Sequence, residues 1–346
     1  LHDALPIYCR IDIKNIADDT AIAAYLVDPA KNEYTIEKLA SEYFGTVIEK
    51  PEVKQLSLLD DVETDRSEYL AKCAVALGVL NERIGDKIKE NGQEKLYQEV
   101  ELPLVTVLAH LEINGFLVDD HQLKEFADKL GEKIDALTNE IYMLAGEEFN
   151  INSPKQLGVI LFEKLELKPV KKTKTGYATN ADVLEKLRDK HPIVNFIMEY
   201  RQLAKLKSTY CDGLRAVVNP NTHRIHSVFT QTVTVTGRLS STEPNLQNIP
   251  TRTELGREIR KMFVAKEGYV LVDADYSQIE LRVLAHIAND ETMINAFRNN
   301  EDIHAVTASQ VLGIPLEDVT KEQRSSAKAV NFGIVYGIGE FSLAQD

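Results

Sequence analysis

The sequence predicts an α+β protein that is mainly helical. Apolar residues recur three and four positions apart over residues 101–113 and 120–144, which is the spacing of amphipathic helices. Strand-like alternation is confined to short stretches, of which residues 224–236 and 269–275 are the clearest. With 346 residues, 44% of them hydrophobic, the chain is long enough for two or three domains that each bury a core.

Local signals define the remaining elements in chain order. Asn114 and Gly115 separate the two long helices. Ser153 followed by Pro154 marks a further helix start, because serine caps a helix and proline fits its first turn. Residues 236–250 are polar and turn-rich. We also expect a strand at 21–27, a basic loop at 168–176, and helices at 69–80, 182–187, 193–206, 279–288 and 321–336.

Composition excludes several classes of protein. The longest apolar run, residues 100–111, contains Glu101 and Pro103 and falls short of the roughly 20 residues that a membrane span requires. The three cysteines are far apart and form no CxxC pair, which indicates a reducing compartment and no structural zinc. The N-terminus lacks the features of a signal peptide. Residues 1–7, LHDALPI, resemble a translated sequencing adapter, so we expect them to be non-native and the chain to be a piece of a longer protein.

Charge is unevenly distributed along the chain. The net charge is −14, which by itself argues against a nucleic-acid partner, because such partners favour basic surfaces. Residues 201–266, however, contain 11 Lys and Arg against four Asp and Glu, a net charge of +7. From charge alone, this stretch is either an ordinary basic surface or the binding site of a polyanion.

Asp275 lies at the end of the predicted strand 269–275, just before a predicted helix. With period two, it shares one face of that strand with Tyr269, Leu271 and Asp273. A carboxylate at the end of an apolar strand is costly unless a cation or hydrogen-bond donors balance it, which is typical of a metal ligand. Asp is also a common helix cap, and spacing alone favours the capping role.

The predicted helix at 321–336 carries cations and aromatic rings on one side. At about 100° per residue, positions four apart drift by only about 40°, so four side chains form one slanting stripe: Arg324, Lys328, Phe332 and Tyr336. Two cations followed by two rings suit a nucleoside triphosphate, with phosphates on the cations and the base on the rings. The alternative is a solvated Lys/Arg face beside core aromatics. A separate apolar face is expected at Ala327, Val330 and Ile334.

Two motifs indicate a family. DYSQIELR at residues 275–282 resembles motif A of the family A DNA polymerases, and RxxxKxxxFxxxYG at residues 324–337 resembles motif B. The resemblance implies a right-hand polymerase fold of thumb, palm and partial fingers. It also implies that Asp275 and the backbone carbonyl of Tyr276 bind two Mg²⁺ ions for an in-line displacement at phosphorus. Glu280 matches the residue that blocks the 2′-hydroxyl of a ribonucleotide.

The same resemblance implies roles for further residues. His304 lies in DIHAVT at 302–307, which resembles the family's DIHxxTA segment, whose histidine reaches the triphosphate. The expected dNTP-binding residues are Tyr276, Gln278, Glu280, His304, Arg324, Lys328, Phe332 and Tyr336. TGRLSSTEPNLQNIP at 236–250 is close to a motif whose arginine and amides contact primer–template DNA, where such donors read minor-groove acceptors. The expected DNA-binding residues are Lys205, Lys207, Arg238, Asn245, Gln247, Asn248 and Arg282.

The first hundred residues are more weakly similar to part of an RNase H-like 3′–5′ exonuclease domain. The third motif of that domain is Tyr, three residues, then a metal-binding Asp, whereas this chain has Tyr69 and then Cys73. Cysteine is a poor ligand for Mg²⁺, which prefers oxygen, so we expect a structural platform without proofreading. The expected boundaries are 1–7 for the non-native residues, 8–98 for the exonuclease-like part, 99–210 for the thumb and its junction with the palm, 211–288 for the palm and 289–346 for the partial fingers.

The expected function is template-directed DNA synthesis in bacterial replication and repair, by a cytoplasmic, nucleoid-associated monomer that uses primer–template DNA and dNTPs. The family's second metal-binding Asp lies beyond motif B, and no equivalent follows Tyr336. We therefore expect this chain to be inactive or nearly so. One alternative is a single-subunit RNA polymerase, against which Glu280 argues. The other is a non-catalytic DNA-binding protein on the same scaffold, which would not need Asp275 but fits the missing second Asp.

Overall fold

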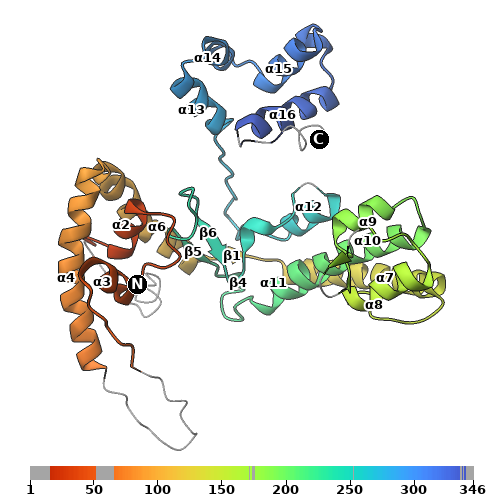
Figure 1. Cartoon of the computed structure of the whole chain (residues 1–346), viewed down its shortest axis with the longest axis horizontal. Coiled ribbons are helices and arrows are strands. Elements are labelled where there is room, and N and C mark those ends of the chain that lie inside the picture. Colours follow the sequence, from red (N-terminus) through yellow and green to blue (C-terminus); the bar gives the residue numbers. More distant parts are fainter. Residues whose placement is uncertain are drawn as a thin grey trace, which may run out of the picture. The chain divides into compact units, whose positions relative to one another are not determined.

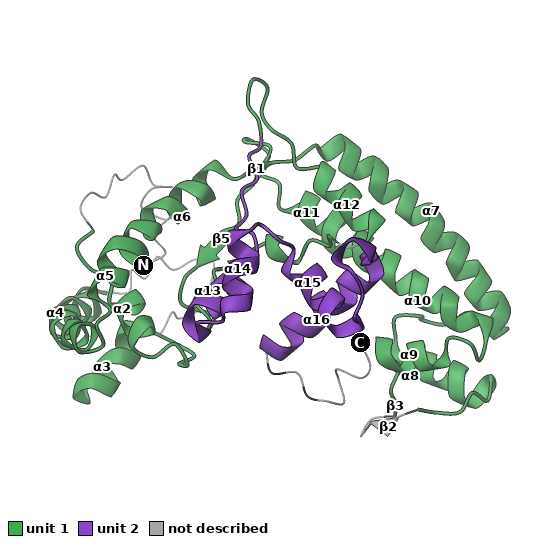
Figure 2. Cartoon of the chain, turned by 90° about the horizontal axis from the view of Figure 1, so that it is seen from above, with its two compact units in different colours: residues 1–270 green, residues 271–346 purple. Residues whose placement is uncertain are grey.

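The computed structural model describes residues 16–51, 66–170, 172–173, 176–251, 253–335, 337 and 339. Within it the chain divides into two compact units, residues 1–270 and residues 271–346, which have different colours in Figure 2. The division falls inside the segment 211–288 that is predicted to be the palm. Residues 1–7, which we expect to be non-native, lie outside the described residues.

Three helices form the N-terminal part of the first unit (Figure 1): α2 (Thr20–Val27), α3 (Ile36–Phe44) and α4 (Ser67–Glu90). Helix α4 packs against both α2 and α3. It buries Leu80 and Ile84 completely in the core that the three helices share. The helix predicted at 69–80 is therefore confirmed as part of a longer one.

The strand predicted at residues 21–27 is wrong, because these residues form α2. The Asp19 carboxylate begins the helix by accepting hydrogen bonds from the backbone N of Ala21 and of Ile22, at 2.9 and 3.0 Å. Four consecutive residues, from Ile22 to Tyr25, are buried. A short run buried on all sides has no periodicity that separates a helix from a strand, so the capping Asp was the informative signal.

A glycine joins the N-terminal helices to the next part of the unit. Helix α5 (Glu94–Leu96) and a π-helical turn (Tyr97–Glu101) lead into α6 (Leu102–Asn114), which ends at Gly115. Gly115 has a φ of +57°, and a Cβ atom there would lie 2.6 Å from the backbone oxygen of Ile225. Because only glycine tolerates this approach, β1 (Phe116–Leu117) can pair antiparallel with β4 (Arg224–Ile225).

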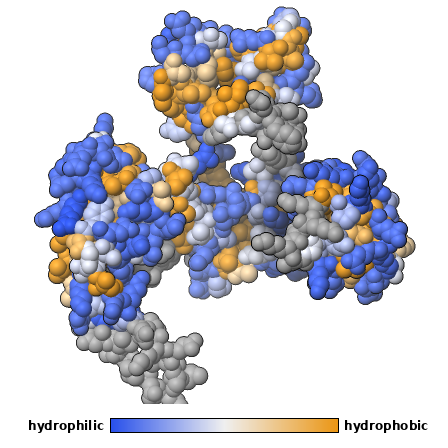
Figure 3. Space-filling view, in the orientation of Figure 1, coloured by the Kyte–Doolittle hydropathy of each residue, from blue (hydrophilic) through white to orange (hydrophobic). Residues whose placement is uncertain are grey.

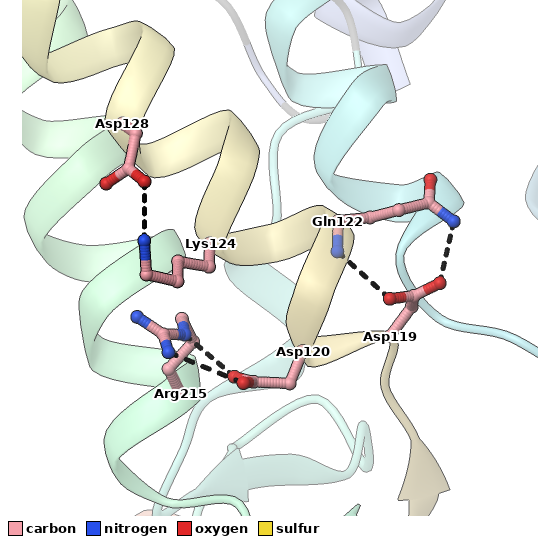
Figure 4. Close-up of polar contacts among 6 residues, drawn as sticks. All are labelled: Asp119, Asp120, Gln122, Lys124, Asp128 and Arg215. Atoms are coloured by element: carbon pink, nitrogen blue, oxygen red, sulfur yellow. Dashed lines mark hydrogen bonds and ion pairs between the residues drawn. The ribbon is translucent and has the colours of Figure 1, made fainter.

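Helix α7 (Asp120–Ala145) agrees with the predicted helix at 120–144, and polar contacts hold its first turn (Figure 4). The Asp119 carboxylate accepts hydrogen bonds from the backbone N and the side-chain Nε2 of Gln122, at 3.0 and 2.7 Å. Asp120 pairs with Arg215 of α11 (Gly213–Ala216), with 2.7 Å between Oδ1 and Nε. The hydrogen bond from Arg215 lowers the pKa of Asp120, so α7 and α11 are tied by an ionised pair.

A helical lobe forms around the distal end of α7, which packs against α10 (Pro192–Lys205). Its other elements are α8 (Pro154–Val159), a π-helical turn (Ile160–Lys164), α9 (Ala181–Leu187) and a second π-helical turn (Leu206–Asp212). Its largest fully buried side chains are Ile141, Leu157, Leu161, Leu184, Ile193 and Ile197. The helices predicted here are confirmed, and the predicted loop at 168–176 overlaps a short antiparallel pair, β2 (Lys172–Thr173) with β3 (Gly176–Tyr177).

A small hairpin carries the segment predicted to contact DNA. Strands β5 (Val228–Thr230) and β6 (Ser240–Thr242) are antiparallel, with Phe229 opposite Ser241. A 3₁₀ turn (Leu246–Asn248) and α12 (Glu254–Lys261) follow. The strand predicted at 224–236 is therefore confirmed only in part, because it contains β4 and β5 while the residues after Thr230 form bends and turns.

The second unit consists of helices around one small core. They are α13 (Ile279–Ala288), α14 (Glu291–Arg298), α15 (Ile303–Leu312), a 3₁₀ turn (Leu316–Asp318) and α16 (Lys321–Val335). Its buried core residues are Leu281, Ala285, Ala296, Phe297 and Ile303. Figure 3 shows hydrophobic surface on this unit, where Val283 and Ile287 of α13 are 47% and 76% exposed. No helix among the described residues combines the length and apolar character that a membrane span needs.

The strand predicted at residues 269–275 is also wrong. The segment is not in a sheet, and Val270 and Val272 are 80% and 84% exposed. A strand is stabilised by hydrogen bonds to a neighbour, and no described segment pairs with this one. Alternation in the sequence indicates strand propensity but not whether a partner is present.

The two faces of α7 give a stability prediction. Ile141 is fully buried in the core of the lobe, whereas Met143, two residues later, is 69% exposed. We expect Ile141→Ala to lower the free energy of unfolding by about 2–5 kcal/mol, because it leaves a cavity. Met143→Ala should change it by less than about 0.5 kcal/mol. Urea unfolding followed by circular dichroism measures both, and equal effects would contradict the described packing.

Candidate active site

The motif A carboxylate lies in the exposed segment that precedes α13. Asp275 and Asp273 are both exposed, and the Tyr276 side chain is 79% exposed. The N-cap of α13 is Gln278, with a φ of +57° and no side-chain capping bond. Asp275 is therefore not the helix cap, so its carboxylate does not have the capping role that spacing alone favoured.

The ligands available for a metal are few. The Asp275 carboxylate and the Tyr276 carbonyl are oxygen ligands of the kind that Mg²⁺ prefers. No group of three or more His, Cys, Asp or Glu that could hold a metal gathers within the described ranges. These two residues fit part of a Mg²⁺ coordination sphere and leave the rest to water, substrate or other ligands.

The two charged motif A residues on α13 differ in their surroundings. Glu280 lies exposed in the first turn of the helix. Arg282 donates a hydrogen bond from Nε to the carbonyl of Ser277 at 2.8 Å, and its guanidinium lies over the ring of Phe297, 4.7 Å from the centroid. The predicted DNA contact Arg282 is thus held against its own unit by a cation–π contact.

An ion pair between α15 and α16 places the first cation of motif B. Asp302 caps α15, accepting hydrogen bonds from the backbone N of His304 and of Ala305 at 3.0 and 3.3 Å. Its other oxygen lies 2.5 Å from Nε of Arg324. Burial would raise the pKa of Asp302, but the hydrogen bonds from Arg324 and the helix outweigh it and hold that pKa below its usual value.

The predicted stripe of motif B is present on α16 as far as the structure describes it. Lys328 follows Arg324, and its Nζ lies 5.9 Å from the centroid of the Phe332 ring. Phe332 itself packs against the core of the unit. Tyr336 lies outside the described residues. The expected apolar face is only partly buried: Ala327 is 8% exposed but Ile334 is 66% exposed, because the unit's core instead receives Phe332 and Val335.

His304 is fully buried between α15 and α16. Its Nδ1 lies 3.1 Å from Nδ2 of Asn331, and its ring is 5.6 Å from that of Phe332. Burial lowers the pKa of His304, and although Asp302 opposes this, Arg324 and Lys328 lower it further. The imidazole is therefore neutral at pH 7. Its Nε2 has no hydrogen-bond partner in the part of the chain that the structure describes.

Asn331 is a residue that sequence reasoning missed. It contacts both His304 and Thr307, with 3.0 Å between its Nδ2 and Oγ1 of Thr307. The available signal was its position beside Phe332, a polar residue between apolar ones on a helix that must pack somewhere. Spacing along one helix does not show which neighbouring helix such a side chain meets.

The predicted DNA-binding residues lie in the first unit and are partly engaged in its own contacts. Lys205 is exposed, whereas Lys207 binds Asp212 at 2.7 Å, a hydrogen bond that raises the pKa of Lys207. Arg238 is exposed on the hairpin. Two hydrogen bonds lie within the amide motif: Asn245 Oδ1 accepts from the backbone N of Gln247, and Gln247 Nε2 donates to the carbonyl of Leu239. A third anchors the motif from outside, because the Tyr210 hydroxyl donates to the carbonyl of Asn248.

Tyr69, from the exonuclease-like motif, has a structural partner. Its hydroxyl donates a hydrogen bond to Glu37 at 2.6 Å, and Glu37 also lies 3.4 Å from Nζ of Lys50. The hydrogen bond to Glu37 raises the pKa of Tyr69. Cys73 is buried in a small apolar cluster, 7% exposed. The hydrogen bond between Tyr69 and Glu37 thus joins α4 to α3. Tyr69, Glu37 and Lys50 also line a cavity of about 850 Å³.

Comparison with known proteins agrees with the helical fold and the motif residues. The sequence model of DNA polymerase family A matches residues 120–346, more than half of the chain. The chain belongs to this family, and the predicted mainly helical polymerase fold is confirmed.

Its relatives are bacterial enzymes named DNA polymerase I. The chain is 48% identical over 343 residues to that of Bacillus subtilis and 44% identical over 344 residues to that of Pseudomonas aeruginosa, covering 97% of itself but 39% and 38% of those proteins. A solved structure of the polymerase domain of Pol1 from M. smegmatis, in complex with DNA primer-template and dNTP, superposes with a TM-score of 0.82 and 38% identity. The superposed region covers 94% of this chain and 55% of the M. smegmatis chain. The chain thus spans about two fifths of the length of the curated relatives it matches.

The Asp302–Arg324 pair gives a pH-dependent prediction. The folded pKa of Asp302 is lowered, so the stability that this pair contributes is present above the ordinary carboxyl pKa and is lost as the pH falls through the folded pKa. We expect Arg324→Gln to raise the pKa of Asp302 toward its usual value, measured by NMR titration of the carboxyl carbon. Arg298→Gln, at an exposed position of the same unit, is the control. An unchanged Asp302 pKa in Arg324→Gln would mean that the pair does not form in solution.

Proposed function

We propose that the chain provides the nucleotide-binding and DNA-binding parts of an enzyme for template-directed DNA synthesis in replication and repair. The observation that carries this proposal is the order of side chains on α16, where Arg324 and Lys328 precede the ring of Phe332. The names of the relatives, DNA polymerase I, support the same reaction. The substrates are primer–template DNA and dNTPs, and the chain acts as a monomer at the nucleoid in the bacterial cytoplasm.

The residues of the second unit divide the tasks of holding a dNTP. Arg324 and Lys328 bind the triphosphate, since charge-assisted hydrogen bonds to phosphate are strong. Phe332 packs on the sugar and base, and Glu280 excludes a 2′-hydroxyl. Asp275 and the carbonyl of Tyr276 hold Mg²⁺, which when bound supplies stabilisation of the charge that develops on the reacting phosphate.

The basic stretch of the first unit supports binding of the primer–template. Lys205, Lys207 and Arg238 offer charge to phosphates, which gives affinity without sequence choice. Lys207 must share or release Asp212 to do so, because the two side chains are paired. The hydrogen bonds of Asn245 and Gln247 within their own loop fix the loop's shape and leave the Nδ2 group of Asn245 available to read a groove.

Selection of the complementary nucleotide by this chain can be tested in a binding experiment in which no nucleotide is added to the primer. With a dideoxy-terminated primer, we expect the dNTP complementary to the template to tighten the DNA complex more than the other three do, measured by fluorescence anisotropy. Lys328→Gln should weaken this effect of the dNTP about tenfold or more, because it removes a charge-assisted hydrogen bond, and should leave binary DNA binding unchanged. Lys321→Gln, on the first turn of the same helix, is the matched control. DNA binding with no response to any dNTP would favour the non-catalytic alternative.

We expect the 346 residues alone to catalyse little or no DNA synthesis and no nuclease reaction. One protein carboxylate holds the metals weakly, and Tyr69 and Cys73 do not form a nuclease site. With Mg²⁺, the purified chain should neither extend a matched primer in the presence of dNTPs nor shorten a mispaired primer in their absence. DNA binding measured in the same samples controls for inactive protein. Robust extension would contradict the weak metal site, and shortening would contradict the platform role of the exonuclease-like part.

A further inference from the structure

A chain of hydrogen bonds between α15 and α16 fixes the orientation of an amide. The Thr307 hydroxyl donates its only hydrogen to the carbonyl of Ile303, at 2.8 Å. Toward any other neighbour, Oγ1 of Thr307 can therefore only accept. The side-chain amide of Asn331 lies 3.0 Å from that oxygen, so the group facing Thr307 must be the NH₂. The amide oxygen of Asn331 therefore points away from Thr307.

The same amide determines where His304 carries its proton. The second hydrogen of the Asn331 NH₂ faces Nδ1 of His304, 3.1 Å away. A donor requires an acceptor, so Nδ1 is unprotonated. Because His304 is fully buried beside two cations of α16, the doubly protonated ring is disfavoured. The proton is therefore on Nε2, which makes that atom a hydrogen-bond donor.

The donor on Nε2 has no partner within the described residues, although the side chain is completely buried. Buried polar groups are nearly always hydrogen-bonded, so an unpaired one indicates a missing acceptor. Burial lowers the pKa of the ring, Asp302 raises it, and Arg324 and Lys328 lower it further. Asp302 is already paired with Arg324, so an oxygen of an anionic ligand beside the two cations is the acceptor that suits Nε2.

We infer that Asn331 is a positioning residue, which holds His304 as the Nε2-protonated tautomer so that the imidazole donates to a phosphate oxygen of the bound nucleotide. Thr307 is the anchor that prevents the amide of Asn331 from turning over. The identity of the ligand rests on the proposed function, whereas the tautomer does not.

NMR of the full chain labelled with ¹⁵N-histidine tests the tautomer. The chain has eight histidines, and the His304 signals are those missing from His304→Gln. We expect an unprotonated Nδ1 and a protonated Nε2. Asn331→Asp places an acceptor opposite Nδ1 and should move a proton to it. Thr307→Val should give a mixture of tautomers, and Thr307→Ser, which keeps the hydroxyl, should restore the original one. Protonated Nδ1 in the unaltered chain would overturn the inference.

Titration with inorganic triphosphate tests the ligand. We expect it to shift the His304 Nε2 signal, and we expect Asn331→Asp to bind triphosphate about tenfold more weakly, which corresponds to one lost hydrogen bond to a charged group. Triphosphate that binds without moving Nε2 would overturn this inference and leave the proposed function intact. If triphosphate shows no binding to the unaltered chain, the proposed nucleotide site fails, while the tautomer result stands on its own measurement.

Discussion

The ion pair between Asp302 and Arg324 is the contact on which the geometry of the second unit's site depends. One Asp302 oxygen caps α15 and the other holds Arg324 of α16, so a single carboxylate sets the positions of both helices. Once Arg324 is fixed, the 3.6-residue period places Lys328 and Phe332 one and two turns further along the same side. The partly buried contact of Asn331 with His304 and Thr307 then opposes rotation of α16 about its axis.

A comparable arrangement supports the hairpin of the first unit. The Glu112 side chain of α6 is 5% exposed and accepts a hydrogen bond from the backbone N of Phe229 in β5 at 2.7 Å. Gln231, also buried, donates to the Glu101 carboxylate at 2.7 Å. Burying such groups is costly unless they are paired, so these bonds specify one position of the hairpin on α6 and the π-helical turn that precedes it. In both units, a few satisfied polar contacts between helices and loops orient the residues that we propose to contact substrates.

Much of the helical fold was predictable because amphipathic helices have a distinct period. Helices α7 and α13 begin and end within a residue of the predicted ranges. The two strand predictions were wrong for different reasons. Residues 22–25 are consecutively buried and show no period, whereas residues 269–275 have the period but no described partner. In the site, spacing predicted the stripe of α16. It did not predict that His304 would be buried or that Asn331 would meet it, because both depend on how two helices pack.

Binding and chemistry are separable in this chain. The groups proposed to bind a triphosphate lie on α15 and α16 and are fixed by contacts within one unit, whereas Asp275 lies in an exposed segment with no capping role. The proposed cation site, with one carboxylate and one carbonyl in an exposed segment, is held in place by few contacts of its own unit. The acidic balance of the whole chain does not by itself oppose nucleic-acid binding, because residues 201–266 carry a net charge of +7 and screening limits the reach of exposed charges to about 10 Å at moderate salt. The net charge of −14 is therefore an average over segments of opposite net charge.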